Sequence, residues 1–372
     1  MSSPLLFSPI RLGRLSLANR IMISPMCQYS AQDGNANRWH MAHLGSLALS
    51  GAGLLTVEAT AVSPEGRITL GCLGLYDDQN EASLKPVVDM LRAASESKLM
   101  LQLGHAGRKA SSARPWEGGA LLSSADGGWE TIAPSAVPHK PDETSPRAMT
   151  RADIQRVTDD FAQAAQRARR LGFDAIELHA AHGYLLHEFL SPIANQRDDD
   201  YGGSLDNRVR LLLEIFNAMR AELGPDIALG VRVTGSDWVE GGWSISDCVS
   251  LCQRLANAGA DFLDVSSGGV SPMQKISIGP GYQVAFAEQV KQSVNIPVIT
   301  VGMITESQQA EDILQLGKAD MVALARAFIA DPRWPWRAAA ALGGTLDGHP
   351  QYYRCLPSSM PKIFGDATTN QR

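Results

Sequence analysis

Eight short segments rich in β-branched and aliphatic residues recur along the chain, and they constrain its fold more than any other feature. They occupy residues 20–26, 54–60, 99–107, 173–180, 228–235, 262–269, 296–302 and 320–327. Segments that are apolar on both faces are typical of parallel strands covered by helices. Eight strands with helices between them predict an α/β fold of the (β/α)8 TIM-barrel class. We expect a single domain over residues 1–372, with a C-terminal tail from about residue 345.

The clearest helical pattern precedes the fourth of these segments and spans residues 150–172. Thr150 and Asp153 match a capping box at its start, and Gly172 is placed to end it. Its apolar residues recur at spacings of three and four, which puts them on one face of a helix. They are Ile154, Val157, Phe161, Ala164, Ala168 and Leu171.

An open, doubly wound sheet is the alternative for a chain that alternates strands and helices. Such a sheet normally carries a glycine-rich phosphate-binding loop directly after an early strand. The segment GAGLLT from Gly51 lacks the third glycine, and it precedes an apolar segment instead of following one. We therefore favour the closed barrel.

One long segment interrupts the alternation. Residues 108–149 follow the third predicted strand and are rich in Gly, Pro, Ser and Trp. Loops of this length are uncommon unless they serve a function. We expect this segment to cap the mouth of the barrel.

Charge and composition disfavour several kinds of partner. The net charge is −6, which gives no support to a nucleic-acid or anionic-membrane partner. No apolar run approaches about 18 residues, and residues 1–20 lack a long apolar core, so we expect neither a membrane span nor a signal peptide. The five cysteines have no C-x-x-C spacing, which suggests reduced thiols in a cytoplasmic protein.

Polar residues occur where most of the predicted strands end. In barrels of this class the chemistry lies at the C-terminal ends of the strands and on the loops that follow. We therefore expect an active site on this face. The residues at the predicted strand ends, most of them polar, are Cys27, Glu58, Ala59, Gln102, His105, His179, His182, Arg232, Ser266, Gly302 and Arg326.

Three histidines (His179, His182 and His187) lie close together within residues 173–192, and their spacing alone leaves their role open. A zinc site normally uses at least three protein ligands, often from an H-E-x-x-H helix or cysteine pairs, and H-A-A-H lacks the glutamate. We expect no metal. His179 and His182 could be structural and satisfy buried backbone groups. For His187 we favour such a structural role. Alternatively, His179 and His182 could donate hydrogen bonds to a substrate oxygen, with Tyr184 nearby.

Four stretches carry the most specific motifs: SPMCQYS, QLGHAGRKA, ELHAAHGYLLHEFLSPIANQRDDDYGGSLDNR and IGPGYQVAFAE. Together they resemble the Old Yellow Enzyme family of FMN-dependent ene-reductases, in particular its xenobiotic-reductase or thermophilic-like branch. The resemblance extends from residue 7 to about residue 357. It implies one FMN-binding (β/α)8 barrel, in agreement with the eight predicted strands.

The resemblance also implies which residues hold the flavin. A glutamine would pair with the amide-like edge of the flavin ring, and an arginine near its N1–C2=O end would stabilise the reduced, anionic flavin. Gly302, Met303, Ala325 and Arg326 match the phosphate-binding region of the family. The matching positions around the flavin ring are Ser24, Pro25, Met26, Cys27, Ala59, Gln102 and Arg232.

For the substrate, the resemblance implies that His179 and His182 bind a carbonyl oxygen or an anion. It makes Tyr184 the proton donor and Tyr29 a further substrate contact.

The tail segment QYYRCLP resembles the QYxRxW ending of the same branch. In that branch the arginine, here Arg354, reaches across a dimer interface into the neighbouring substrate pocket. The resemblance thus implies a homodimer, or a tetramer of dimers. Leu356 stands where the branch has tryptophan.

We therefore expect an FMN-dependent NAD(P)H oxidoreductase that uses NADPH or NADH to reduce the activated C=C bond of small enones or nitro compounds. A different FMN barrel reductase is one alternative, such as a dihydropyrimidine or dienoyl-thioester reductase. The latter normally adds an iron–sulfur cysteine cluster and further domains. A flavin- or ligand-binding barrel without turnover is another, although Tyr184 and the paired histidines argue against it.

Overall fold

The computed structural model describes residues 4–355 and 362–365, and at its centre eight parallel strands close into a barrel. Around the barrel their order is β10-β11-β12-β3-β4-β5-β8-β9. The eight strands are β3 (Ile21–Ile23), β4 (Leu54–Ala61), β5 (Lys98–Gly104), β8 (Ala175–Ala180), β9 (Ala228–Thr234), β10 (Phe262–Ser266), β11 (Val298–Val301) and β12 (Met321–Leu324). Each lies within or overlaps one of the predicted segments, so the predicted barrel is confirmed.

Prolines shorten two of the predicted strands. The first predicted segment extends to Met26, but β3 ends at Ile23, two residues before Pro25. The seventh begins at Ile296, but β11 starts at Val298, directly after Pro297. Proline has no N–H to donate to a strand ladder, which accounts for both differences.

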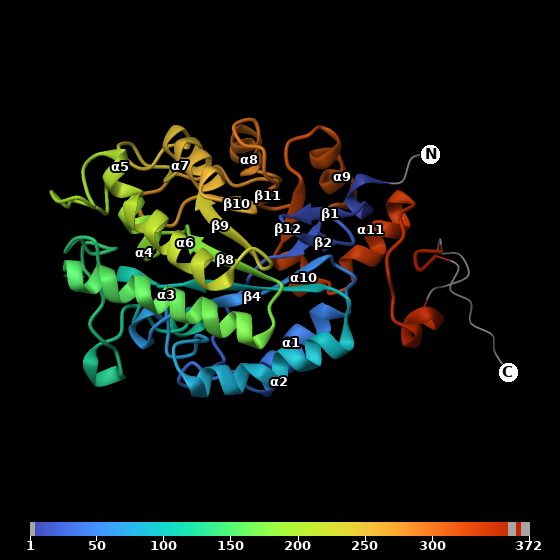
Figure 1. Ribbon diagram of the computed structural model, residues 1–372, viewed down its shortest axis with the longest axis horizontal. Coiled ribbons are helices and arrows are strands. Elements are labelled where there is room, and N and C mark those ends of the chain that lie inside the picture. The colour runs from blue at the N-terminus through green and yellow to red at the C-terminus, as the bar shows by residue number, and fades with distance from the viewer. Residues whose placement is uncertain (1–3, 356–361, 366–372) are drawn as a thin grey trace.

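Helices surround the barrel. Figure 1 shows α1, α2 and α3 along one flank, with α7, α8 and α9 along the opposite one. The longer helices are α1 (Arg38–Ala48), α2 (Asp78–Ala94), α3 (Arg151–Leu171), α6 (Arg210–Leu223), α7 (Ile245–Asn257), α8 (Val284–Lys291), α9 (Ser307–Gln315) and α11 (Trp334–Leu342). The shorter ones are α4 (Leu185–Leu190), α5 (Leu205–Arg208) and α10 (Arg326–Ala330). No helix in the described part of the chain is both long and apolar enough to span a membrane.

Helix α3 forms as the sequence predicts. Thr150 and Asp153 make a reciprocal capping box at its start, and Gly172 ends it in the left-handed conformation (φ 89°). All six predicted apolar residues are buried. The helix packs mainly against α6 and also contacts α2, which fixes it on the outside of the barrel.

A hairpin that was not predicted from the sequence closes the N-terminal end of the barrel. Strands β1 (Ile10–Leu12) and β2 (Leu15–Leu17) pair antiparallel around Gly13, which has φ 57°. Leu12 and Leu17 are buried in one cluster with side chains from the barrel interior, including Met22 and Phe262. The apolar plug keeps water out of this end, so polar chemistry is confined to the other.

The predicted cap over residues 108–149 is an ordered loop with two very short strands, β6 (Ile132–Ala133) and β7 (Arg147–Ala148). Buried Arg108 ties the loop down, because its guanidinium donates to the carbonyls of Val137, Pro138 and Val270. All five cysteines are free thiols.

Candidate active site

The predicted site residues gather at the C-terminal end of the barrel, where eight parallel strands end together. Gln102 lies in β5, His179 in β8 and Arg232 in β9, and all three are buried. The other predicted flavin positions lie in β4 or directly after β3, β11 and β12: Ala59, Ser24, Pro25, Met26, Cys27, Gly302, Met303, Ala325 and Arg326.

His179 and Tyr184 form the centre of a compact ring cluster. The His179 ring lies edge-on to Tyr184, with centroids 5.0 Å apart, and edge-on to His182 at 5.2 Å. His179 Nδ1 accepts the N–H of Ala181 at 3.2 Å, so the proton of the neutral ring lies on Nε2. Burial, helped by Arg232 and Lys109, keeps the pKa of His179 well below its usual value. His179 therefore offers a neutral N–H donor at neutral pH.

His182 is held differently. Its Nε2 lies 2.7 Å from the Ser266 hydroxyl at the end of β10, so Nδ1 is the ring nitrogen left for a ligand. Ser266 Oγ is also 3.2 Å from Gln283 Oε1, which already accepts the Ser267 hydroxyl at 2.7 Å. From the sequence, Ser266 is recognisable only as a strand end. Its contact with His182 joins residues 84 positions apart, so no local pattern reveals it.

Lys109 is a site residue that the sequence analysis did not single out, although it lies in the quoted QLGHAGRKA motif. Its ammonium is 4.8 Å from the centre of the Tyr184 ring. It donates to the carbonyls of His182 (2.8 Å) and Gly269 (3.0 Å). Burial lowers the pKa of Lys109 to about 8. Conversely, burial raises the pKa of Tyr184 well above its usual value, so its phenol keeps its proton.

Glu58, in β4, holds the segment after β3. Its carboxylate accepts the Gln28 N–H at 3.0 Å and lies 3.5 Å from His40 Nε2. Burial, then the neighbouring Cys72 and Glu58, raise the pKa of Cys27 well above the usual value of a thiol. Cys27 therefore carries a thiol, not a thiolate. Tyr29 follows in a left-handed conformation (φ 51°).

His187 is separate from this cluster and lies in α4. Its Nε2 is 2.8 Å from Asp237 Oδ1, its Nδ1 accepts the Gly183 N–H at 2.7 Å, and both side chains are fully buried. Asp237 also accepts the Ser191 hydroxyl and the Trp243 N–H. This geometry agrees with the structural role that we favour for His187. No group of three or more potential metal ligands occurs among the described residues.

Two cavities adjoin the cluster. One of about 20 Å³ is lined by Ala59, Cys72, His179 and Tyr184 among others. Another of about 190 Å³ lies under the cap and is lined in part by Tyr29, Lys109 and His139. A further cavity, of about 510 Å³, lies at the other end of the barrel, between the tail residues 345–350 and the starts of β3, β4 and β5. We place the active site at the first two, because only there do the polar strand ends converge.

A family model describing the NADH:flavin oxidoreductase / NADH oxidase family matches residues 5–343. The chain belongs to this family. An NADPH dehydrogenase from Geobacillus sp. (strain WCH70) is 43% identical over 352 residues, which cover 94% of this chain and 98% of the relative. The structure of morphinone reductase superposes with a TM-score of 0.76 at 32% identity, covering 94% of this chain and 92% of that one. Together these matches support membership of the Old Yellow Enzyme family.

A third match, 2-naphthoyl-CoA reductase, has a TM-score of 0.82 at 26% identity and covers 91% of this chain. The match covers only 52% of that longer protein, so about half of it has no counterpart here. Because the chain belongs to the NADH:flavin oxidoreductase / NADH oxidase family and its relatives include NADPH dehydrogenases, it is an FMN-dependent NAD(P)H oxidoreductase.

The residues present at the barrel end fit this cofactor. Gly302, which the resemblance assigns to the phosphate-binding region, has φ 125°, and a Cβ there would lie 2.8 Å from Gln283 Nε2. The buried Ser24 hydroxyl has no hydrogen-bond partner among the described residues. A buried polar atom left unpaired in this way is costly unless a ligand satisfies it.

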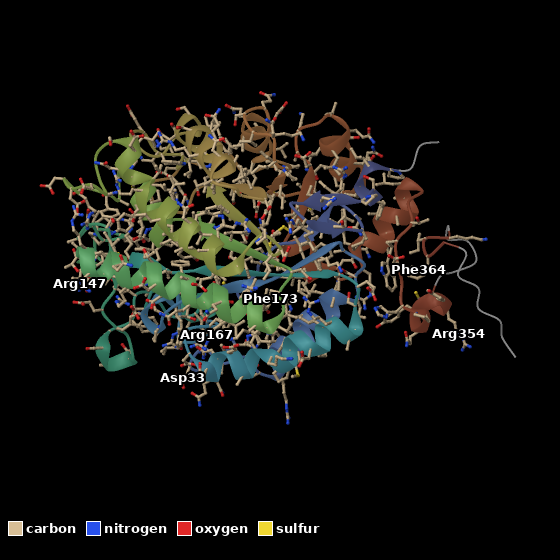
Figure 2. The ribbon with its side chains drawn as sticks, viewed as in Figure 1. Asp33, Arg147, Arg167, Phe173, Arg354 and Phe364 are labelled. Atoms are coloured by element: carbon tan, nitrogen blue, oxygen red, sulfur yellow. The ribbon has the colours of Figure 1, made fainter. Side chains whose placement is uncertain are left out.

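Arg354 lies at the opposite end of the molecule. It belongs to a short 3₁₀ helix over Pro350–Cys355 and is exposed. Figure 2 shows it far from Arg147, which lies in the cap. The tail is not loose, because Tyr352 packs on Trp336 with ring centroids 5.5 Å apart. Leu356, which stands where the branch has tryptophan, lies outside the described residues.

The buried His187–Asp237 pair generates a stability prediction. Asp237→Ala should lower the free energy of unfolding by about 3–5 kcal/mol, because His187 and Ser191 lose their buried acceptor. Asp226→Ala is the control: this carboxylate is 81% exposed beside Arg14, and its loss should cost less than about 0.5 kcal/mol. Equilibrium urea unfolding measures both. Equal stability of the two variants would contradict the assigned role.

The same pair predicts a pH dependence. Burial alone would raise the pKa of Asp237, but His187, Ser191 and the Trp243 N–H outweigh it and hold the pKa below its usual value. The stabilisation is therefore present above about pH 4 and is lost as the pH falls through the lowered pKa. Asp237→Ala should lack this acid-linked loss.

Proposed function

We propose that this chain is an ene-reductase, which reduces the activated C=C bond of small α,β-unsaturated carbonyl or nitro compounds. The observation that carries the proposal is the pairing of a neutral His179 Nε2–H donor with the protonated Tyr184 phenol, whose rings lie 5.0 Å apart. One can hold an oxygen on which negative charge develops, and the other can supply a proton.

Bound FMN would supply the hydride chemistry, taking hydride from a nicotinamide and passing it to the β-carbon of the alkene. The chain's own residues do the rest. His179 holds the substrate oxygen through Nε2–H. His182 binds the same oxygen through Nδ1–H when its Nε2 accepts the hydroxyl proton of Ser266. The Ser266 proton is available for this contact because the Ser267 hydroxyl already donates to Gln283 Oε1. Tyr184 gives its proton to the α-carbon.

Lys109 assists Tyr184 in this scheme. When the phenol gives up its proton, negative charge remains on the tyrosine, and an ammonium 4.8 Å from the ring centre stabilises it. Tyr29, under the cap, contributes a substrate contact. Cys27 contacts the flavin as a thiol and does not act as a nucleophile, because burial favours its protonated form.

Phenols that mimic the substrate oxygen test the two histidines. In the variant with both His179→Ala and His182→Ala, the affinity of the oxidised enzyme for p-hydroxybenzaldehyde should fall by about 1.5–3 kcal/mol for each lost hydrogen bond to the charged phenolate. Titration of the long-wavelength charge-transfer band measures the affinity. Cys252→Ala, remote in α7, is the control. An unchanged phenol affinity in the double variant would refute the assignment.

Tyr184→Phe tests the proton donor and, with it, the reaction. After anaerobic reduction with NADPH, reoxidation by an enone should be roughly 10²–10⁴-fold slower than in the wild type, because the general acid is gone. Reduction by NADPH needs no proton from Tyr184 and should change much less. Stopped-flow absorbance separates the two half-reactions.

The controls for this experiment lie in the choice of substrate. Nitro-olefins should tolerate Tyr184→Phe better, because water can protonate their nitronate product later. Equal loss in both half-reactions would instead make Tyr184 a packing residue. A wild-type enzyme that reduces no enone or nitro-olefin would overturn the proposed substrate class and favour another FMN barrel reductase or a carrier.

We further propose that Arg354 serves the substrate pocket of a neighbouring subunit in a homodimer. The position of the tail at the N-terminal end of its own barrel supports this, because Arg354 is remote from its own mouth (Figure 2). Such an exchange requires an isologous interface, in which each chain gives and receives one arginine. Arg354→Ala should then raise the substrate KM and leave the FMN content unchanged.

Mixed dimers make this prediction specific. A dimer of one Arg354→Ala chain with one Tyr184→Phe chain has one site lacking both residues and one site retaining both. It should show about half the wild-type activity with a wild-type KM. If Arg354 acted within its own chain, or if the protein were a fully active monomer at working concentration, no such recovery would occur.

A further inference from the structure

Below the ring cluster lie four buried polar side chains from four strands: Gln102 (β5), Glu177 (β8), Arg232 (β9) and Asp264 (β10), called here the carboxyl network. Glu177 Oε1 accepts the Gln102 amide N–H at 2.7 Å. Arg232 Nε lies 3.1 Å from Asp264 Oδ2. The carboxyl groups of Glu177 and Asp264 are both fully buried, and Arg232 is the cation that acts on both.

Two ionised carboxylates beside a single guanidinium would leave one negative charge uncompensated in a dry interior, which is strongly unfavourable. With one proton on the pair of acids, the cation of Arg232 and the remaining carboxylate balance, and the network is neutral. The complete burial of both acids beside one cation thus requires the pair to hold a proton.

The proton belongs mainly to Glu177. Burial, then the nearby Asp264, raise the pKa of Glu177 to about 8. Asp264 is the carboxylate that balances Arg232, whose Nε lies 3.1 Å from Asp264 Oδ2. The charged groups acting on Glu177 are Asp264 and Arg232 on the two following strands; Gln102 is neutral, and His179 on the same strand is held neutral.

We propose that Glu177 and Asp264 are positioning residues for the flavin site: by sharing one proton they orient Gln102 and balance Arg232, and so set how strongly the site favours reduced flavin. The hydride path and the proton transfer from Tyr184 that we propose do not require these acids. The inference rests on the flavin placement proposed above, in which Gln102 and Arg232 contact the ring.

The expected consequence is a proton-linked flavin potential. Reduced flavin is anionic, so it is favoured while the network is neutral and disfavoured once Glu177 ionises beneath it. By reciprocity, reduction of the flavin raises the proton affinity of Glu177. At a potential fixed by a reference dye, the ratio of reduced to oxidised flavin should therefore fall more steeply above about pH 8. The additional fall should be about tenfold per pH unit, compared with an enzyme in which flavin reduction is not linked to protonation of Glu177.

Two variants test the proposal in the holoenzyme. Glu177→Gln keeps the shape and the neutral charge and can still accept from Gln102, so it should abolish the extra pH dependence while matching the wild type near pH 7. The double variant Glu177→Gln/Asp264→Asn leaves Arg232 without a counter-ion. Its reduced-to-oxidised ratio should rise roughly tenfold or more at every pH. A wild-type pH slope in Glu177→Gln, or no rise in the double variant, would overturn the proposal.

Infrared spectroscopy of the wild-type protein keeps the proposal testable even if a variant folds poorly. A protonated, buried carboxyl gives a C=O stretch that ionisation removes, and this band should disappear as the pH rises through about 8. Its absence at pH 6 would also overturn the proposal. Neither measurement uses an enone, so loss of the proposed ene-reductase activity and failure of this inference are distinguishable outcomes.

Discussion

The desolvation of polar groups at one end of a closed parallel barrel is the constraint on which the rest of this structure depends. The hairpin β1–β2 seals the N-terminal end with leucines, so every buried polar side chain of the interior must be satisfied by another near the mouth or by a ligand. This explains why the site is built of mutual contacts. His179 is fixed by the Ala181 N–H, His182 by Ser266, and Gln102 by Glu177.

The same desolvation selects the protonation states. Burial disfavours the charged form of every group, whatever its type. It keeps His179 neutral, Tyr184 a phenol and Cys27 a thiol, and it lowers the pKa of Lys109 to about 8. A site with neutral donors can hold a substrate oxygen before reaction and answer the negative charge that appears during it. One physical effect thus prepares several residues for the chemistry that we propose.

The sequence predicted the elements whose signal is local. All eight strands and α3 with both of its caps follow from apolar spacing and from Thr150, Asp153 and Gly172. The site positions at strand ends follow from the topology of the barrel, although their roles stay predictions. What the sequence could not provide are contacts between distant strands. The carboxyl network of Glu177 and Asp264 depends on how four strands are placed around the barrel, and a buried acid within an apolar run carries no mark of its partner.

The barrel mouth also stores backbone strain, and the way it is held connects the parts of the site. Tyr29, His182 and Met303 all have positive φ (51°, 60° and 48°), which costs of order 1–3 kcal/mol for a non-glycine residue. The carbonyl of each accepts a side-chain N–H from another segment, which comes from Arg114, Lys109 and Gln309 respectively. Two of these donors, Arg114 and Lys109, belong to the cap. The cap therefore fixes the backbone of Tyr29 and of His182, which are two of the residues that we propose to meet the substrate.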